Sequence, residues 1–309
     1  ARVHAEGSEE EEEEAAAPPP EAPEDEGSAG NSDSEDYFSC SDDDEGVRPR
    51  RRQSSASPGV EAARADFERR SAAFPRGHGD HSWSPLSAES FPVRSTTYLS
   101  DRRKEPSSPA LFELAHIDCT QIGEGGPVHR VAEAPGFYPA VLRRSGDDRF
   151  LFVLNLTITP FQVVLSGVVD PAAQRMSPAA LRLFRQFLSM APEEQRARFK
   201  LIASIEEGPW VVRSLLPNTK KPVIIAKTVP MEAWHRADNY LEVSLNVAAG
   251  RAWERVVNLV VKQARRLVMS LAVLIEGLSE EELPEALLLT GMVSRLDTSR
   301  VQRPDSDEA

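Results

Sequence analysis

Glycine, histidine and cysteine are the residues whose spacing first suggests chemistry in this sequence. The Gly-Glu-Gly-Gly run at residues 123–126 has the composition of a phosphate-binding loop, but no Lys-Ser/Thr pair follows it and Pro127 lacks an N–H donor. His116 and Cys119 are close in sequence, yet no further metal ligand stands at a suitable spacing. No nucleophile, base and orienting group can be assembled from the other residues. The sequence therefore predicts a turn at residues 123–126 and no catalytic residue, metal site or cofactor.

Charge divides the chain into two unlike parts. Residues 1–46 contain 18 acidic residues and one arginine, which leaves residues 47–309 with a net charge of +4 out of the total of −13. A charged, proline-rich tail buries too little apolar surface to offset chain entropy, so residues 1–80, including a basic Ser/Pro linker, are expected to be disordered. No nucleic-acid motif is present and the aromatic residues do not alternate with basic ones, so no nucleic-acid partner is predicted. Two cysteines are too few for a disulfide framework and indicate a reducing compartment.

One short segment of the acidic tail combines adjacent aromatic residues with acids on both sides. Its defining positions are Asp36, Tyr37, Phe38, Ser39, Cys40 and Asp42. The segment resembles the two-phenylalanines-in-an-acidic-tract (FFAT) motif, which binds vesicle-associated-membrane-protein-associated proteins (VAP) on the endoplasmic reticulum. Ser39 stands where the conventional motif has an acid and where its phosphorylation-dependent version has Ser or Thr. The resemblance implies a phosphorylation-controlled contact with a VAP-type receptor. An acidic tail with serines suited to acid-directed kinases is the alternative.

Apolar periodicity predicts the elements of the folded part. Apolar residues at every second position of residues 150–158 predict a strand, and Thr159-Pro160 predicts the turn into a second strand. Ser177 and Pro178 predict the N-cap and first turn of a helix that ends near Pro192. The strands expected in addition to the first lie at residues 161–169, 199–205, 223–229, 240–247 and 286–296.

Residues 251–275 fit one long amphipathic C-terminal helix. On a helical wheel, apolar residues from Trp253 to Ile275 form a broad stripe, and basic residues lie opposite. Beyond Val268 every face is apolar, which predicts that the last turns are buried. The basic face comprises Arg251, Arg255, Lys262 and Arg266, which are the candidate residues for binding anionic lipid headgroups. An ordinary solvated helix face is the alternative.

Several ordered blocks between residues 81 and 301 carry a family resemblance. They include Trp83-Ser84, Phe91-Pro92-Val93-Arg94, Phe152-Val153-Leu154-Asn155-Leu156, Glu207-Gly208-Pro209-Trp210 and Asn239-Tyr240-Leu241-Glu242. These blocks resemble the C-terminal domain of the plant Enhanced Disease Resistance family of lipid-associated regulators. The resemblance implies a cytosolic domain that acts at membranes, without established catalytic chemistry. The sequence departs from the family at residues 218–222 and 248–250, so no shared ligand contact is carried over there.

The sequence thus predicts an α+β fold in which an antiparallel sheet packs around the long C-terminal helix. The domain is expected to span residues 81–301 and to fold without the tail, and residues 302–309 are expected to be disordered. START-like lipid cavities share this plan, but periodicity leaves open whether the interior is hollow or filled. The predicted function is non-enzymatic lipid binding or lipid-transfer-like regulation, peripheral at endomembranes in the cytoplasm, with an anionic lipid or membrane surface as partner. The alternative is a protein interaction module with a closed core and no lipid ligand.

Overall fold

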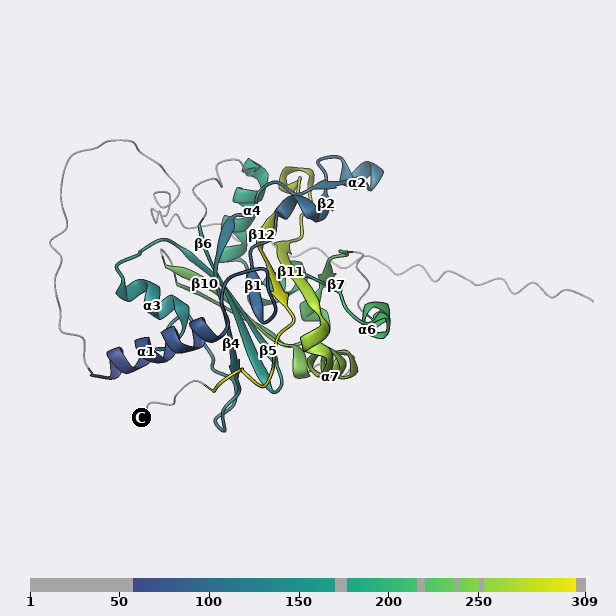
Figure 1. The fold of residues 1–309 in the computed structure, drawn as a ribbon. Coiled ribbons are helices and arrows are strands. Elements are labelled where there is room, and N and C mark those ends of the chain that lie inside the picture. The colour runs from purple at the N-terminus through teal and green to yellow at the C-terminus, as the bar shows by residue number, and fades with distance from the viewer. Residues whose placement is uncertain (1–57, 170–176, 216–219, 237–238, 250–252, 304–309) are drawn as a thin grey trace, which may run out of the picture. The chain divides into compact units, whose positions relative to one another are not determined.

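Two five-stranded sheets form the centre of the molecule, with helices at their ends and over their outer faces (Figure 1). The structure is a computed structural model that describes residues 58–169, 177–215, 220–236, 239–249 and 253–303. The predicted acidic tail, including the FFAT-like segment, lies outside the described residues, as does Arg251. The mixture of helices and sheets confirms the α+β class.

Each sheet combines strands from distant parts of the chain. The first sheet has the order β1 (Ser82–Ser84), β12 (Leu287–Ser294), β11 (Val268–Ile275), β7 (Phe199–Glu207) and β8 (Val223–Ile224). The second has the order β4 (Phe112–Gln121), β6 (Phe161–Val169), β5 (Leu151–Ile158), β10 (Tyr240–Asn246) and β9 (Met231–Arg236). A separate two-stranded sheet consists of β2 (Pro92–Arg94) and β3 (Lys104–Pro106).

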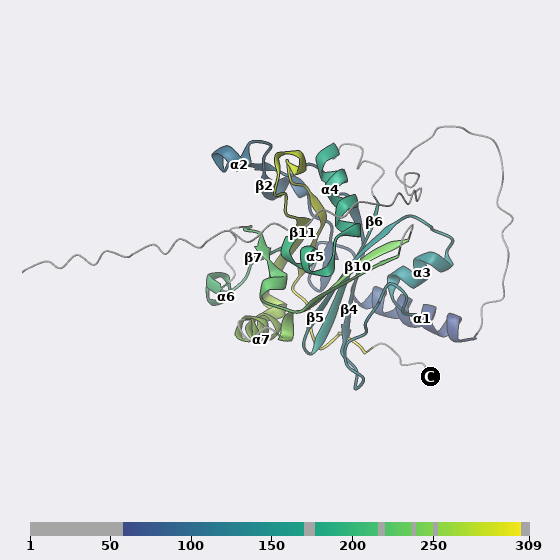
Figure 2. The same ribbon diagram turned by 180° about the vertical axis from the view of Figure 1, so that it is seen from behind.

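The helices are short and lie around the sheets. They are α1 (Pro58–Ala73), α2 (Tyr98–Asp101), α3 (Tyr138–Arg144), α4 (Pro178–Ser189), α5 (Pro192–Arg198), α6 (Trp210–Leu215) and α7 (Glu254–Gln263). The described residues also contain the 3₁₀ helices η2 (Ala88–Ser90), η4 (Ile225–Lys227), η5 (Val247–Ala249), η6 (Ala264–Arg266) and η7 (Glu280–Glu282). Both views place α1 and α3 on the side of the second sheet and α6 beside α7 near the first (Figure 2).

The central hairpin and the helix after it confirm the periodicity arguments. Strands β5 and β6 pair in antiparallel register through the turn at Thr159-Pro160. Helix α4 begins where predicted, because the Ser177 hydroxyl accepts a hydrogen bond from the Ala180 N–H at 3.1 Å. Its buried face includes Leu183, Phe184 and Phe187, while Leu181 is half-buried.

The second sheet is buried on both faces. Its outer face carries Leu151 and Val153 of β5, which pack with Phe137 from the preceding connection. Its inner face carries Phe152, whose ring centroid lies 5.5 Å from that of Phe112. The sheet is mixed, because β10 pairs with β5 in parallel and the other ladders are antiparallel. Burial on both faces explains why β5 is apolar at nearly every position.

The two sheets touch at one end and are separated by a helix at the other. A Cβ atom on Gly167 of β6 would lie 2.7 Å from Leu289 Cδ1 of β12, so a residue without a side chain is required for this close approach. At the other end of β6, Phe161 and Val163 face side chains of α7 across a cavity. Helix α7 therefore lies where the sheets diverge.

The prediction of one long C-terminal helix is wrong. Helix α7 ends at Gln263, η6 follows, and the chain then continues as β11 in the middle of the first sheet. The run from Val268 to Ile275 is apolar on all sides because it is a central strand that is covered on both faces. A single sheet around a single long helix is accordingly replaced by two sheets with a ten-residue helix between them.

Helix α1 lies in the segment that was expected to be a linker. The Arg70 side chain, 4% exposed, donates to Asp66 at 2.9 Å, to Asp118 of β4 at 3.2 Å and to the Gly136 carbonyl. Phe67 and Phe74 of the same segment are buried. The sequence predicted a disordered linker here, whereas the structure has a helix that an ion pair between Arg70 and Asp118 anchors to β4.

A second buried ion cluster joins the first sheet to the β2–β3 hairpin. Lys200 Nζ of β7 lies 3.0 Å from Glu276 Oε1 and 3.0 Å from Glu285 Oε1. Arg94 of β2 contacts the same two carboxylates, at 2.5 Å and 3.6 Å. The Glu285 side chain is 1% exposed, and these cations together with the backbone N–H groups of Arg94 and Gly277 take the place of water around it.

Candidate functional site

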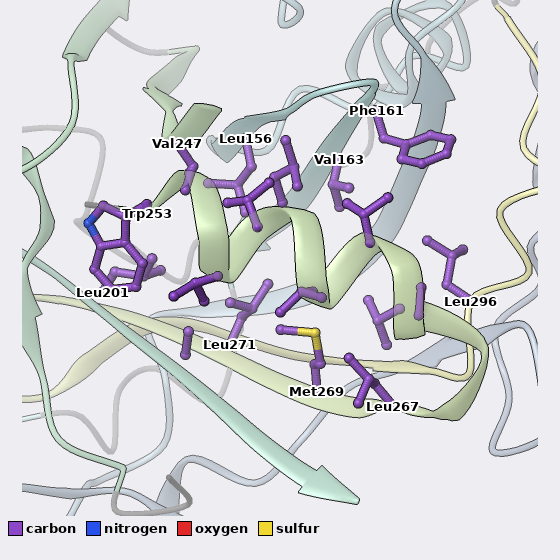
Figure 3. Close-up of a pocket in the computed structure, with 18 of the residues that line it drawn as sticks. Leu156, Phe161, Val163, Leu201, Val247, Trp253, Leu267, Met269, Leu271 and Leu296 are labelled. Atoms are coloured by element: carbon purple, nitrogen blue, oxygen red, sulfur yellow. The ribbon is translucent and has the colours of Figure 1, made fainter. Parts of the chain in front are cut away.

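An apolar cavity of about 190 Å³ lies between α7 and the two sheets. Figure 3 shows α7 crossing it, with Leu156 and Val163 of the second sheet on one side and Met269 and Leu271 of β11 on the other. Alternation along each strand produces this lining: Leu271 faces the cavity, whereas Ala272 and Leu274 pack on the other face of the sheet. The cavity thus exists because the two sheets diverge here and α7 does not fill the space between them.

Helix α7 covers the cavity with a face of valines. The cavity-lining residues of the helix itself are Val256, Val257, Val260 and Val261. Their spacing places them on one side of a helix, yet only Val257 is fully buried, and the others are half-buried. The helix lacks a side-chain N-cap, and the Trp253 indole N–H donates instead to Thr228 Oγ1 at 2.9 Å. Helix α7 is therefore held by apolar contacts with the two sheets that leave part of the space beneath it empty.

The cavity reaches the surface beside β8. Lys221 and Val223 both line the cavity and are both exposed, Val223 to 43%. Strand β8 is the last strand in the order of the first sheet. Lys221 and Thr298 are the members of the lining with a charged or hydroxyl side chain. A ligand could therefore place an apolar part inside and a polar part at the mouth, near the Lys221 ammonium.

The volume sets what the cavity can hold. An engineered apolar cavity of about 150 Å³ stays dry and accepts a benzene ring, whereas pockets for whole drug-sized ligands have about 300–1,000 Å³. At about 190 Å³ this cavity accommodates one ring or a segment of an acyl chain. A larger apolar ligand would require α7 to move outward.

The predicted cationic face lies outside the cavity. Arg255 and Lys262 of α7 and Arg266 of η6 are exposed, and no ion pair involves them among the described residues. Their neighbour Arg265 instead contacts Asp297. Arg255 and Lys262 are seven positions apart, which places both on one face of α7. The structure thus places Arg255 and Lys262 on the same face of α7, and Arg266 follows in η6 after the helix ends.

The buried polar groups support the fold. Glu242 of β10 accepts hydrogen bonds from the backbone N–H groups of Val131 at 3.2 Å and Ala132 at 2.9 Å, which attaches their connection to the second sheet. Burial raises the pKa of the Glu242 carboxyl, and the N–H of Ala132 opposes this shift. Burial also raises the pKa of the Cys119 thiol to about 12, so it stays protonated and a poor nucleophile. Sequence reasoning gave Glu242 no role, although it is a lone acid in a predicted strand and belongs to one of the family blocks.

The remaining sequence candidates have simple structural roles. Gly126 donates its N–H to the Gly123 carbonyl at 3.1 Å, which confirms the turn at residues 123–126. Within the described residues, no group of three or more His, Cys, Asp and Glu side chains could hold a metal ion. Also among those residues, every helix is too short or too polar to cross a bilayer.

Comparison with known proteins gives the chain a family. The family model described as "Protein ENHANCED DISEASE RESISTANCE 2, C-terminal" matches residues 83–297, a range that includes the described strands except for Ser82 of β1 and the cavity lining except for Thr298. The "Protein ENHANCED DISEASE RESISTANCE 2-like" of Arabidopsis thaliana is 27% identical over 225 residues, which are 73% of this chain and 30% of that protein. The chain therefore spans less than a third of that relative's length, and no solved structure matches it. The chain belongs to the Enhanced Disease Resistance 2 C-terminal domain family.

Proposed function

We propose that this chain is a non-enzymatic regulatory protein that binds a lipid, with an apolar part of the lipid in the cavity beneath α7. The observation that carries the proposal is the cavity itself, which is apolar except at its mouth. The helix that covers it, α7, has cavity-lining valines that are for the most part only half-buried. A filled core would bury the valines of α7 completely, because protein interiors pack to the density of organic crystals. The space beneath α7 matches the apolar part of a lipid.

The proposal includes a peripheral position at cytoplasmic endomembranes. Exposed cations at Arg255, Lys262 and Arg266 would meet anionic headgroups, each contributing on the order of 1 kcal/mol near a charged membrane surface. Arg251 belongs to the same proposed set by its place in the sequence, outside the described residues. A non-enzymatic role agrees with the structural duties of the buried acids and cations, such as Glu242, Lys200 and Arg70.

Filling the cavity is expected to reduce lipid binding without loss of stability. Ala203 of β7 lines the cavity, so Ala203→Leu would place three additional carbon atoms inside it. We expect the fraction of the full chain that carries lipid to fall by about tenfold and the unfolding temperature to stay equal or rise, since the added atoms occupy empty space. Native mass spectrometry after incubation with mixed-lipid vesicles measures the bound fraction.

The control is the same exchange outside the cavity. Ala140 is a half-buried alanine of α3, and Ala140→Leu should leave the lipid-bound fraction unchanged. Equal lipid binding by Ala203→Leu and the unchanged protein would show that the cavity is not the site. A folded protein that carries no lipid under any of these conditions would favour a protein interaction module with no lipid ligand.

The tail is proposed to contact a VAP-type receptor of the endoplasmic reticulum under the control of phosphorylation at Ser39. Tyr37 and Phe38 would supply the apolar contact, and a phosphate would add charge where the motif lacks an acid. We expect phosphorylation to strengthen binding by about tenfold, the effect of one charge-assisted hydrogen bond. Calorimetry of a peptide of residues 31–46 with a VAP domain, with and without phosphate, measures this. Equal affinities would rule out the switch, and unchanged binding by Phe38→Ala would rule out the motif.

A further inference from the structure

Helix α6 and strand β8 both contact β7, and the surface that they form beside it, which we call the corner, carries three of the four large exposed hydrophobic residues of the described chain. Trp210 is 80% exposed and Val211 42%, and both open α6. Val223 of β8 is also exposed, and Leu278, in the loop after β11, is the fourth large exposed hydrophobic residue of the described chain. A tryptophan this exposed contrasts with Trp83, which is 2% exposed. Exposed apolar side chains on elements that adjoin a cavity are typical of an interaction surface.

Helix α6 is anchored so that these side chains must point outward. Val212 is fully buried and packs with Ile205 of β7 and with Leu267. Gly208 turns the chain into α6 with a φ of 155°, and a Cβ atom there would overlap Leu267 Cδ2. The buried Val212 and the tight turn hold one face of α6 against the domain. Trp210 and Val211 therefore project from a fixed support rather than from a loose loop.

The surroundings of this corner are positively charged. Leu259 and Val260 of α7 pack against the cluster that contains Val212, and the two helices are in contact. Arg255 and Lys262 lie one turn before and after Leu259 on the same face of α7, so they flank the contact with α6. Further exposed cations are Arg213 of α6, Lys221 before β8 and Lys227 of η4, and no ion pair involves them among the described residues.

The acids near the corner neutralise little of this charge. Glu206 contacts Lys220 at 3.7 Å, and Glu207 contacts Arg295 at 2.5 Å, so both are engaged with other cations. Glu254 at the start of α7 is the exposed acid of that helix. The corner therefore combines an exposed indole with an excess of positive charge, and its chemical complement is an anionic surface that also accepts apolar side chains.

We propose that the corner of α6 and β8 enters the interfacial region of an anionic phospholipid bilayer and thereby places the cavity mouth against the membrane. Tryptophan prefers the depth of the lipid headgroups because its ring is apolar and its N–H is polar. Basic residues around it would bind anionic headgroups, and Val223 would face the bilayer at the mouth. This inference deepens the proposed function, because it rests on a lipid ligand for the cavity and adds the route by which the lipid enters.

The test compares three variants of the full chain on vesicles of phosphatidylcholine with and without phosphatidylserine. We expect Trp210→Ala to weaken sedimentation with the anionic vesicles by about tenfold or more, since it removes the largest inserted apolar surface. Leu278→Ala, an equally simple truncation of an exposed apolar residue elsewhere, should bind as the unchanged protein does. Trp210→Phe should keep most of the binding, since it retains an aromatic ring.

Quenching by brominated acyl chains then locates the indole. The quenching of tryptophan fluorescence is measured for the unchanged protein and for Trp210→Phe, and the difference between the two is the contribution of Trp210. This difference should be largest for bromine atoms at a shallow depth in the bilayer. Equal vesicle binding by Trp210→Ala and the unchanged protein would overturn the inference, as would failure of the unchanged protein to bind anionic vesicles, in which case a protein partner becomes the occupant to test.

Native mass spectrometry separates failure of this inference from failure of the lipid-binding proposal. When lipid is supplied in solution rather than in vesicles, Trp210→Ala should carry as much lipid as the unchanged protein, because the cavity remains intact. Absence of lipid from both proteins would count against the cavity as a binding site, whatever the vesicles show. Loss of lipid from Trp210→Ala alone would contradict a role for Trp210 confined to the membrane.

Discussion

A chain that begins at residue 81 is expected to unfold far more easily than one that begins at Arg50, because it lacks α1. Truncation removes Arg70 and leaves the Asp118 carboxylate, 2% exposed, without its closest cation. Breaking a buried ion pair by removing one partner costs about 3–5 kcal/mol, a large part of the total stability of an ordinary domain. Loss of the buried Phe67 and Phe74 adds to this cost.

Urea unfolding of the two chains and of two point variants measures the effect. Arg70→Met should lower the free energy of unfolding by about 3–5 kcal/mol. Arg64→Met should lower it by less than about 1 kcal/mol, because Arg64 is 69% exposed and pairs with Glu68 at the surface. Equal unfolding midpoints for chains that begin at residues 50 and 81 would show that the domain starts at β1 and that α1 only rests on it.

Replacing Lys200 is expected to be the most damaging single change in the first sheet. Lys200→Met leaves Glu285 with Arg94 as its remaining cation, at 3.6 Å, and leaves both Glu276 and Glu285 with fewer donors. We expect a loss of about 3–5 kcal/mol. Because Arg94 belongs to β2, the same change should loosen the β2–β3 hairpin, seen as faster amide hydrogen exchange there.

A double-mutant cycle separates the ion cluster from general damage. Glu285→Gln combined with Lys200→Met removes both charges and should cost less than the sum of the single changes. Lys104→Met, the same exchange at an exposed lysine of β3, should change stability by less than about 0.5 kcal/mol. Strict additivity of the two buried changes would mean that Lys200 and Glu285 do not stabilise each other.

The sequence predicted best the elements whose local signals agree with their surroundings. Strands β5 and β6 combine alternation with a proline turn, and α4 combines an N-cap serine with a first-turn proline. The boundary between α7 and β11 failed for a physical reason. Residues 268–275 are apolar on every face, so their side chains fit a buried helix as well as a central strand, and a run of eight residues is ambiguous by periodicity alone. Length and flanking Arg265 and Arg266 were the signals for a strand.

Helix α1 was missed, and the cavity was left undecided, because neither depends on apolar periodicity. Helix α1 is attached through the Arg70 guanidinium in addition to the buried Phe67, and a buried arginine has the same sequence signature as an exposed one. The cavity depends on the divergence of two sheets, and the same valines of α7 would serve a filled core. Trp210 stood within a family block, but its exposure follows from the burial of Val212, which only the fold reveals.

The pairing of β1 with β12 has a consequence for synthesis. Ser82 of β1 lies opposite Ser294 of β12. The ribosome therefore adds roughly 210 residues after β1 before the strand that pairs with it is complete. Pairings this distant give a high contact order and slow folding, and they leave strand edges open on a growing chain. On a ribosome the first sheet can close only after its second strand, β12, has emerged. Because both ends leave from the same edge, a larger protein could carry this domain as an insert with entry and exit side by side.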